Sequence, residues 1–442
     1  MAFTRYMGRS SHVYTALGVT LAFASIVHAA GEKGSAKKDT KDQFDWTLHD
    51  PEKAGMSSGG LAKVRKAIQK NIDKKVIPGA ATAIVRHNKL VWFEAQGVRD
   101  TKTSAPMTKN TIFRLMSGRK PITAVAVLML MDHGNLGLDD PVSKFIPEFK
   151  GQKVAVAEKW ATDASKVKLV PADREITIKD LLTHTSGLSS LGDLTGRNSG
   201  SLVNKIDRKP VDTLADYIPR LGEAALDFQP GTKWRYSPLD GFDTLLRIVE
   251  ITSRKSAEEF LNENLFKPLD MNDTFFNVPE EKKVRLASIH SSKNGKFQIE
   301  KHFFGEGRWK YHSGAGGLFS TVHDCMQFEV MLLNKGTLDG KRMLKAETVG
   351  LMAKNHVGKL FAEWIPFITA GQGFGLGVSV VEDKYKGDGR GVGAFGWGGA
   401  YGTESWVDPE LGVAAVMFIQ MQPAPGNVKS EFQQSLRKAI VP

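Results

Sequence analysis

Residues 113–131 read FRLMSGRKPITAVAVLMLM, and within them an irregular stretch gives way to a long apolar helix. At the junction stand Ser117 and Lys120, and residues three apart on a helix lie on the same face. A serine hydroxyl is a weak nucleophile until a neighbouring base takes its proton, and a lysine whose charge is disfavoured by burial can be that base. The positive end of the helix dipole would lie beside the reacting atoms. By itself, the tetrapeptide equally fits a helix start with an exposed lysine.

A tyrosine motif, Tyr236-Ser237-Pro238, stands directly before a predicted helix. A tyrosine hydroxyl beside a catalytic lysine can relay protons as a phenol or a phenolate. Taken alone, the tyrosine is equally explained as a side chain that packs at the start of the helix. The motif therefore supports the chemistry of Ser117 and Lys120 only if the fold brings the three side chains together.

Near the C-terminus, residues 395–403 read FGWGGAYGT and precede a strong hairpin signal. Glycines on both sides of Trp397 allow an edge strand to approach a ligand closely. A backbone N–H at this edge could face an acyl oxygen and complete an oxyanion hole. The alternative is a glycine-rich entry to a hairpin, in which Trp397 only packs.

Strand patterns occur near both ends of the chain, and helical patterns lie between them. Residues 80–85 and 90–96 predict one hairpin, and residues 403–407 and 413–421 predict a second. Helical periodicity is found at residues 57–70, 117–134, 176–182, 211–221, 239–252, 257–265 and 429–440. We therefore predict an α/β (α+β type) fold. One antiparallel sheet is built from both ends of the chain and flanked by helices, with a mostly helical insertion.

The N-terminus resembles a secretory signal peptide. Residues 1–30 contain Arg5 and Arg9, then an apolar run, then the small residues Ala29 and Ala30. The run is short for a bilayer span, so we favour cleavage over a retained anchor and expect a periplasmic or secreted protein. Without residues 1–30 the formal charge falls from +12 to +10, because two arginines and no acidic residues are lost. The remaining charges are scattered.

The rest of the chain is long enough, and at 41% hydrophobic apolar enough, for a large core. We predict a basic linker (31–48), the N-terminal part of an α/β domain with the nucleophile helix (49–135), a mostly helical domain (136–310) and the C-terminal part of the α/β domain (311–442). Zinc-ligand spacing, phosphate-cradling loops and basic–aromatic stripes are absent from the sequence, so we expect no metal, no cofactor and no nucleic-acid partner. Cys325 is the only cysteine, which excludes an internal disulfide, and its helical context is typical of a small core residue.

The order of the motifs resembles a known superfamily. Ser-x-x-Lys, then Tyr-Ser-x, then a glycine-rich edge strand is the order in class C β-lactamase-like serine hydrolases, which include penicillin-binding proteins and family VIII carboxylesterases. Supporting stretches are similar too, namely residues 181–188 (LLTHTSGL), 316–321 (GGLFST) and 373–377 (GFGLG). The resemblance covers residues 55–422 and implies a β-lactamase/transpeptidase-like fold.

The resemblance also implies a role for each motif. Ser117 is then the acylated nucleophile, Lys120 accepts its proton, and Tyr236 shares the acid/base work. The backbone N–H groups of Ser117 and Ala400 form the oxyanion hole, and Trp397, Gly398 and Gly399 line one edge of the acyl pocket. His184 is expected to be a structural histidine bonded to the backbone rather than a catalytic residue.

Three departures from the superfamily pattern bear on the substrate. Arg119 stands where a small hydroxyl residue is usual. It is expected to project to a different helix face, and if turned inward its charge would disfavour protonation of Lys120. Pro238 replaces an asparagine, so an amide that could hold a substrate amide is missing. Trp397 replaces a lysine that binds substrate carboxylates, and this form is similar to that of family VIII carboxylesterases.

We therefore expect an exported serine hydrolase that cleaves small neutral carboxylic esters through an acyl-enzyme. A β-lactamase or D-stereospecific peptidase or amidase on the same scaffold is the first alternative, and the missing lysine and asparagine count against it. A non-catalytic, cell-wall-associated binding protein is the second, and the intact Ser117, Lys120 and Tyr236 count against that. The sequence leaves the oligomeric state and the natural ester open.

Overall fold

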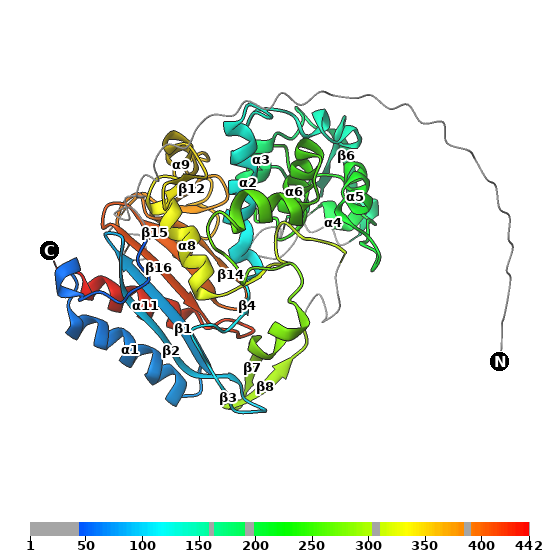
Figure 1. The fold of residues 1–442 in the computed structure, drawn as a ribbon. Coiled ribbons are helices and arrows are strands. Elements are labelled where there is room, and N and C mark those ends of the chain that lie inside the picture. Colours follow the sequence, from blue (N-terminus) through cyan, green and yellow to red (C-terminus); the bar gives the residue numbers. More distant parts are fainter. Residues whose placement is uncertain (1–43, 159–162, 191–198, 303–309, 384–389, 442) are drawn as a thin grey trace, which may run out of the picture. The chain divides into compact units, whose positions relative to one another are not determined.

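Strands from both ends of the chain pair in one antiparallel sheet (Figure 1). The structure is a computed structural model that describes residues 44–158, 163–190, 199–302, 310–383 and 390–441, all within one unit, Asp42–Pro442. The sheet has eight strands in the order β12 (Gln372–Phe374), β13 (Ser379–Val381), β14 (Phe395–Gly399), β15 (Thr403–Asp408), β16 (Val413–Phe418), β1 (Gly79–Arg86), β2 (Lys89–Asp100) and β3 (Ala105–Pro106). The predicted sheet architecture is thus confirmed.

The two predicted hairpins meet at the centre of this sheet. Strand β1 pairs with β16 from Ala81↔Phe418 to Arg86↔Val413, and every residue of both strands is buried. The turn between β1 and β2 holds His87 and Asn88 in the left-handed region, with φ of 48° and 59°. That conformation gives the tight turn a twist that matches the strands it connects.

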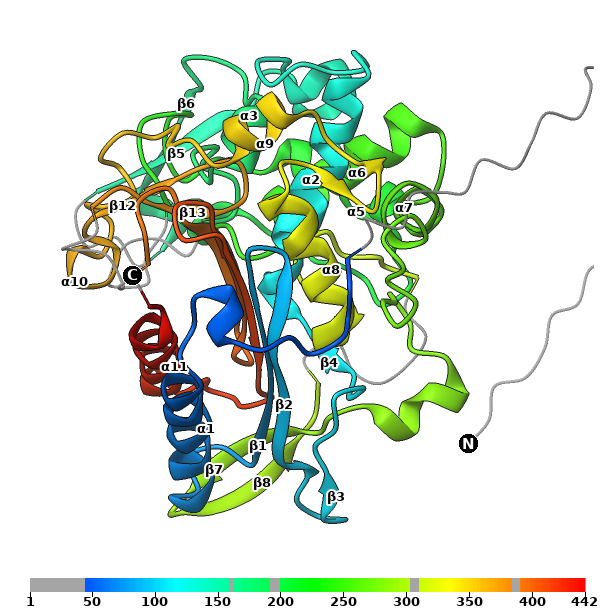
Figure 2. The same ribbon diagram turned by 60° about the vertical axis from the view of Figure 1, so that its left-hand side comes forward.

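Helices cover both faces of the sheet, and Figure 2 shows α1 (Ser58–Asp73) beside α11 (Gly426–Ala439) on one of them. Alternate residues of β1 point to opposite faces. Ile84 therefore belongs to the core under α1 and α11, whereas Ala83 and Val85 belong to the larger core on the other side. That larger core contains α2 (Lys120–Asp132) and α8 (Val322–Leu333). All residues of α2 from Lys120 to Leu130 are buried, as expected for a central helix that is apolar all round.

The inserted segment is less purely helical than predicted. Its helices are α3 (Ile178–Leu182), α4 (Gly200–Val203), α5 (Leu214–Tyr217), α6 (Asp240–Ser253) and α7 (Ala257–Leu261), and its hairpins are β5 (Lys153–Ala157) with β6 (Val167–Pro171) and β7 (Ile289–Lys293) with β8 (Lys296–Glu300). The expected helix over 257–265 changes after α7 into a π-helical turn, Asn262–Phe266. The remaining elements are β4 (Phe113–Arg114), β9 (Phe319–Ser320), β10 (Thr337–Leu338), β11 (Lys341–Arg342), α9 (Ala346–Met352) and α10 (Pro366–Thr369).

The predicted signal segment (1–30) and most of the predicted linker (31–48) lie outside the described residues. Among the helices that the structure does describe, none combines the length and the apolar character needed to cross a membrane. The predicted boundaries near residues 136 and 311 stay predictions.

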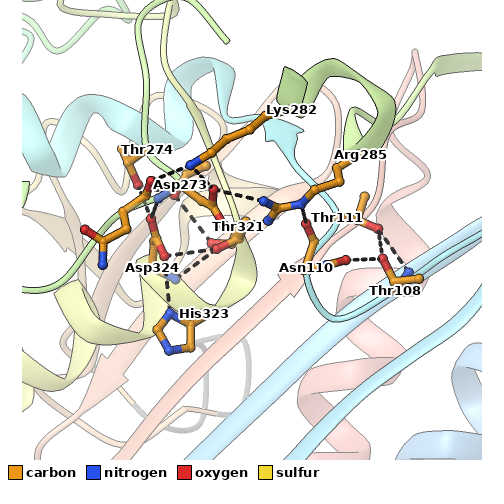
Figure 3. Close-up of polar contacts among 12 residues, drawn as sticks. Thr108, Asn110, Thr111, Asp273, Thr274, Lys282, Arg285, Thr321, His323 and Asp324 are labelled. Carbon is orange, nitrogen blue, oxygen red and sulfur yellow. Dashed lines mark hydrogen bonds and ion pairs between the residues drawn. The ribbon is translucent and has the colours of Figure 1, made fainter. Parts of the chain in front are cut away.

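A polar cluster fixes the segment that leads into β4 and the segment that follows β9 (Figure 3). Asp273 accepts hydrogen bonds from Lys282 Nζ at 2.8 Å and Arg285 Nη1 at 3.0 Å, and its own N–H donates to Asp324 Oδ2 at 2.7 Å. Arg285 Nε reaches the Asn110 carbonyl at 2.8 Å. The cluster joins residues that precede β4 to residues that begin α8, and β4 pairs with β9 between them. We call these five residues the Asp273–Asp324 cluster.

Candidate active site

Ser117 lies in a 3₁₀ turn, Met116–Arg119, that leads directly into α2. Side chains three residues apart eclipse one another in a 3₁₀ turn, which places Lys120 over Ser117. The residue before the serine, Met116, has a φ of 49°, a left-handed conformation that is rare for a residue with a side chain. Such strain persists only where the surroundings fix the backbone.

The backbone before Ser117 is held by the C-terminal strands. Thr403 Oγ1 donates to the Leu115 carbonyl at 2.7 Å. The side-chain amide of Gln420 accepts from Arg114 N at 3.0 Å and donates to the Arg114 carbonyl at 3.2 Å. These bonds, from a residue of β15 and from a residue just after β16, fix the turn that presents Ser117.

The structure brings Ser117, Lys120 and Tyr236 together. Lys120 Nζ lies 3.2 Å from Ser117 Oγ, and the Tyr236 hydroxyl donates to Ser117 Oγ at 2.7 Å. Lys120 is fully buried, whereas Ser117 and Tyr236 are half-buried and so accessible from one side. A nucleophile with two titratable partners at hydrogen-bond distance is the arrangement that general acid–base catalysis needs.

Two carbonyl oxygens, which the sequence did not predict, hold the amine of Lys120. Its Nζ donates to the Pro238 carbonyl at 2.7 Å and to the Ala315 carbonyl at 3.2 Å. It also lies 5.0 Å from the ring centre of Tyr236 and 5.6 Å from that of Phe242. Pro238 was interpreted only as the loss of an amide, but its backbone oxygen is one of the closest contacts of the lysine.

Strand β14 ends against the 3₁₀ turn of the serine. A Cβ atom on Gly399 would lie 2.1 Å from the Leu115 carbonyl oxygen and 2.3 Å from Thr403 Oγ1, so only glycine allows this approach. The approach brings the exposed Ala400 to the same junction as Ser117. The oxyanion-hole roles of the Ser117 and Ala400 N–H groups stay a prediction.

Aromatic rings line the side of the site beyond Tyr236. The ring of Trp397 lies 5.7 Å from that of Tyr236 and 5.3 Å from that of Phe374, and Phe361 and Trp234 continue this wall. The indole Nε1 of Trp397 is buried and has no hydrogen-bond partner among the described residues. The side chain that Trp397 contributes to this edge of the site is therefore an uncharged aromatic ring.

His184 packs beneath Tyr236, as expected for a structural histidine. Its Nδ1 accepts from Ser237 N at 3.2 Å, and its ring lies 4.7 Å from that of Tyr236. Burial, assisted by the charge of Lys120, lowers the pKa of His184 well below its ordinary value. The ring is therefore neutral, with its proton on Nε2.

Arg119 turns inward and is fully buried, so a surface role is excluded. Its guanidinium donates to the Ser313 carbonyl and, at 3.2 Å, to Thr123 Oγ1, and it lies 4.8 Å from the ring centre of Phe276. Burial lowers the pKa of Arg119, and the charge of Asp243 opposes that effect.

Asp243 is a further charged residue beside the site, and the sequence analysis did not single it out. It lies on the buried side of α6 with only 1% of its surface exposed. A signal was present in the sequence, because an acidic residue follows Phe242 and lies close to Leu245 and Leu246 in a predicted helix that starts just after Tyr236. Acidic residues in such places are rare unless they are paired.

The protein also has a cavity of about 490 Å³ that the site residues do not line. Its lining includes Arg99, Arg114, Asn277 and Phe319, but none of Ser117, Lys120, Tyr236 and Trp397. The candidate active site is therefore identified by the contacts among Ser117, Lys120 and Tyr236, and not by this cavity. Cys325 is buried in α8, and burial raises the pKa of its thiol, which agrees with the predicted core role.

Proteins of known sequence resemble this chain over most of its length. Protein Rv1367c of Mycobacterium tuberculosis is 33% identical over 384 residues, which cover 83% of this chain and 90% of that protein. Esterase EstB of Burkholderia gladioli is 29% identical over 398 residues, covering 83% of this chain and 92% of the esterase. Each match covers more than four fifths of this chain.

Solved structures with the same fold include EstCE1, a hydrolase with promiscuous acyltransferase activity. It superposes with a TM-score of 0.71 at 25% identity and covers 86% of this chain and 98% of its own. A family VIII carboxylesterase superposes with a TM-score of 0.65 at 16% identity, covering 87% of this chain and 99% of its own, which shows the fold alone. Residues 64–438 match the family model described as Beta-lactamase. The chain therefore belongs to the β-lactamase family and is a serine hydrolase of that fold.

Proposed function

We propose that this protein cleaves small neutral carboxylic esters through an acyl-enzyme on Ser117, with Lys120 and Tyr236 as the proton-transfer unit. The observation that carries the proposal is the set of three contacts around Lys120 Nζ: Ser117 Oγ at 3.2 Å, Pro238 O at 2.7 Å and Ala315 O at 3.2 Å. This arrangement supports the role of the amine as a base.

The two carbonyls orient a neutral amine. A neutral lysine has two N–H bonds and one lone pair, and carbonyl oxygens can only accept hydrogen bonds. When the two N–H groups of Lys120 point to Pro238 O and Ala315 O, the lone pair is left facing Ser117 Oγ. The amine is then ready to take the serine proton as the oxygen attacks an acyl carbon.

Tyr236 supports departure of the alcohol as the acyl-enzyme forms. Its hydroxyl, 2.7 Å from Ser117 Oγ, lies where the leaving alkoxide departs, and it can pass a proton there. The Ser117 and Ala400 N–H groups would stabilise the negative oxygen of the tetrahedral intermediate. Water then attacks the acyl group, with the same pair of side chains working in reverse.

The preference for neutral esters rests on Trp397 and Pro238. Trp397 places an aromatic ring 5.7 Å from that of Tyr236, and this side chain offers no positive charge to a substrate carboxylate. Pro238 offers its backbone oxygen to Lys120 and has no amide that could hold a substrate amide. These two residues disfavour a β-lactamase or peptidase as the main activity.

The names of the relatives agree with an ester substrate, because one is an esterase and EstCE1 is a hydrolase with promiscuous acyltransferase activity. An acyl-enzyme can be attacked by an alcohol as well as by water, so transfer to an added alcohol belongs in the same assay. Export to the periplasm or the medium remains part of the proposal, supported by the basic and apolar pattern of residues 1–30.

The proposal is tested by intact-protein mass spectrometry after incubation with a panel of acyl donors that includes p-nitrophenyl butyrate, nitrocefin and a fluorophosphonate. We expect one adduct, located on Ser117, and turnover of the ester far above that of nitrocefin. Ser117→Ala should lose both adduct and turnover, whereas Ser430→Ala, a serine on the exposed side of α11, should lose neither. Wild-type turnover by Ser117→Ala, or nitrocefin cleaved as fast as the ester, would contradict the proposal.

A further inference from the structure

Two basic side chains follow the nucleophile into the interior. Arg119 and Lys120 are both fully buried. A buried charge is costly unless an opposite charge and hydrogen bonds compensate it. The carbonyl oxygens around the two side chains supply hydrogen bonds but no net charge, so an anion is needed nearby.

Asp243 is placed to be that anion. Its Oδ1 accepts from Ser313 Oγ at 2.7 Å and from Ala315 N at 3.1 Å, and its Oδ2 accepts from the Tyr311 hydroxyl at 2.8 Å. Ser313 Oγ itself accepts from the backbone N–H groups of Ala315 and Gly316, so its own proton points to Asp243. Three donors around one carboxyl group favour its ionised form.

The same carboxylate fixes the turn that holds both cations. Asp243 binds the side chain of Ser313 and the N–H of Ala315. The carbonyl of Ser313 accepts from Arg119, and the carbonyl of Ala315 accepts from Lys120. One acidic side chain is thus linked through a short turn to both residues that follow the nucleophile.

We propose that Asp243 and Arg119 form a matched pair that positions Lys120 and sets how readily its amine is protonated. The inference rests on the proposed role of Lys120 as the base. Arg119 opposes protonation of the neighbouring amine by charge repulsion, and Asp243 favours it by attraction. The two effects offset each other, which allows an arginine to stand next to the proposed base in the interior.

Other titratable groups also face this interior. Burial raises the pKa of Asp243, and the hydrogen bonds from Ser313 and Tyr311 and the charges of Lys120 and Arg119 oppose that effect. Asp240, Tyr217 and Tyr311 interact with Asp243, and Arg208 interacts with these three residues, whereas His184 and Tyr236 face Lys120. Of these, Asp240 is the only further acid, and burial raises its pKa to about 6.

The test is the pH dependence of kcat/KM for p-nitrophenyl butyrate, since protonation of the base produces the acidic limb of that profile. Arg119→Met removes the repulsion, so the acidic limb should move to higher pH by about one unit. Asp243→Asn removes the attraction and should move the limb to lower pH by a similar amount. In the double variant the limb should return close to its wild-type position.

Two controls separate charge from structure. Arg119→Lys keeps the positive charge and should leave the limb in place, even if the lost contacts to Ser313 and Thr123 lower kcat. Asp212→Asn removes another buried carboxylate, paired with Arg220 away from the site, and should lower the melting temperature without moving the limb. The pH dependence of labelling by a fluorophosphonate gives the same readout without turnover.

The inference is overturned if Arg119→Met and Asp243→Asn move the limb in the same direction, or if neither moves it. If Asp243→Asn does not fold, the contrast between Arg119→Met and Arg119→Lys still decides, because only the former should shift the limb. A wild-type protein that is not labelled on Ser117 would overturn the proposed function instead, so the two failures are distinguishable.

Discussion

Two polar clusters in this protein join distant chain segments, but their positive charges are compensated in different ways. In the Asp273–Asp324 cluster, Asp273 is paired with two cations, and its side chain and theirs keep between 23% and 31% of their surface exposed. Around Ser117, the cations Arg119 and Lys120 have no exposed surface, and neither forms a direct ion pair among the described residues. Carbonyl oxygens and one carboxylate acting through a turn compensate them instead.

This difference in charge compensation suits one cluster to stabilising the fold and the other to catalysis. A cation in a direct, partly hydrated ion pair is held in one protonation state, because solvent and partner both favour its charge. A buried amine without a direct counter-ion can gain and lose a proton with a modest change in its surroundings, which suits a base. The first cluster should therefore affect folding alone, and the second should affect turnover.

The strongest test of this contrast removes the two proton-transfer groups of the site. Lys120→Met and Tyr236→Phe should each lower kcat by about 10²–10⁴-fold, because each deletes a partner of Ser117 Oγ. The double variant should lose little more than the worse single variant, since groups that act as one unit are not additive. Steady-state kinetics of the four proteins on p-nitrophenyl butyrate supply the cycle, and fully multiplicative losses would assign the two residues separate roles.

A smaller effect is expected when a charge is added at the half-exposed edge of the site. Trp397→Lys should raise the ratio of nitrocefin to ester kcat/KM by roughly ten- to a hundredfold, because a lysine forms a charge-assisted hydrogen bond with a substrate carboxylate. Trp397→Phe, which keeps an apolar ring, serves as the control and should leave the ratio near that of the wild type. An unchanged ratio in an active Trp397→Lys variant would show that the side chain at position 397 does not determine the preference for neutral over charged substrates.

The smallest effect concerns the Asp273–Asp324 cluster. Burial opposes ionisation of Asp273, yet the hydrogen bonds from Arg285 and Lys282 outweigh it and hold the pKa of Asp273 below its ordinary value. Asp273→Asn should therefore lower the free energy of unfolding by about 1 kcal/mol near pH 7 and leave kcat unchanged.

The sign of the pH dependence follows from the lowered pKa. The contribution of Asp273 is fully present above the aspartate pKa of the unfolded chain, about 4, and is lost as the pH falls through the lower folded value. Denaturation curves of wild type and Asp273→Asn should thus differ at pH 7 and converge in acid. Curves that stay equally separated at low pH would exclude this ion pair as the cause.

The sequence predicted the elements whose cause is local. Alternating strands, the helix after Ser117 and the hairpin after Trp397 follow from periodicity and turn residues. The order of the three motifs, Ser-x-x-Lys, Tyr-Ser-x and the glycine-rich strand, indicated the superfamily. The proximity of Ser117 and Lys120 also follows from their spacing on one turn. The proximity of Tyr236 followed only from the resemblance, because 119 residues separate it from the serine.

Contacts made by backbone atoms and by buried charges could not be predicted. The Pro238 and Ala315 carbonyls contact Lys120 through main-chain oxygens, which every residue type carries. Arg119 points inward because a carbonyl and an aromatic ring from distant segments, together with a hydroxyl one helical turn away, receive it. Its helical position alone indicated another face. Asp243 was missed for the same reason, since its partners at 311–315 lie far along the chain.

The pairing of β1 with β16 determines when the active site can assemble as the chain is synthesised. Ala81 meets Phe418, Leu115 is held by Thr403, and Arg114 is held by Gln420. The ribosome therefore delivers the serine long before the strands that fix its turn, because Thr403 follows Leu115 by 288 residues. Contacts between such distant residues are slow to form. A chain truncated before β15 carries Ser117 without the geometry to use it, so the reactive centre is assembled only after β15 and β16 have been made.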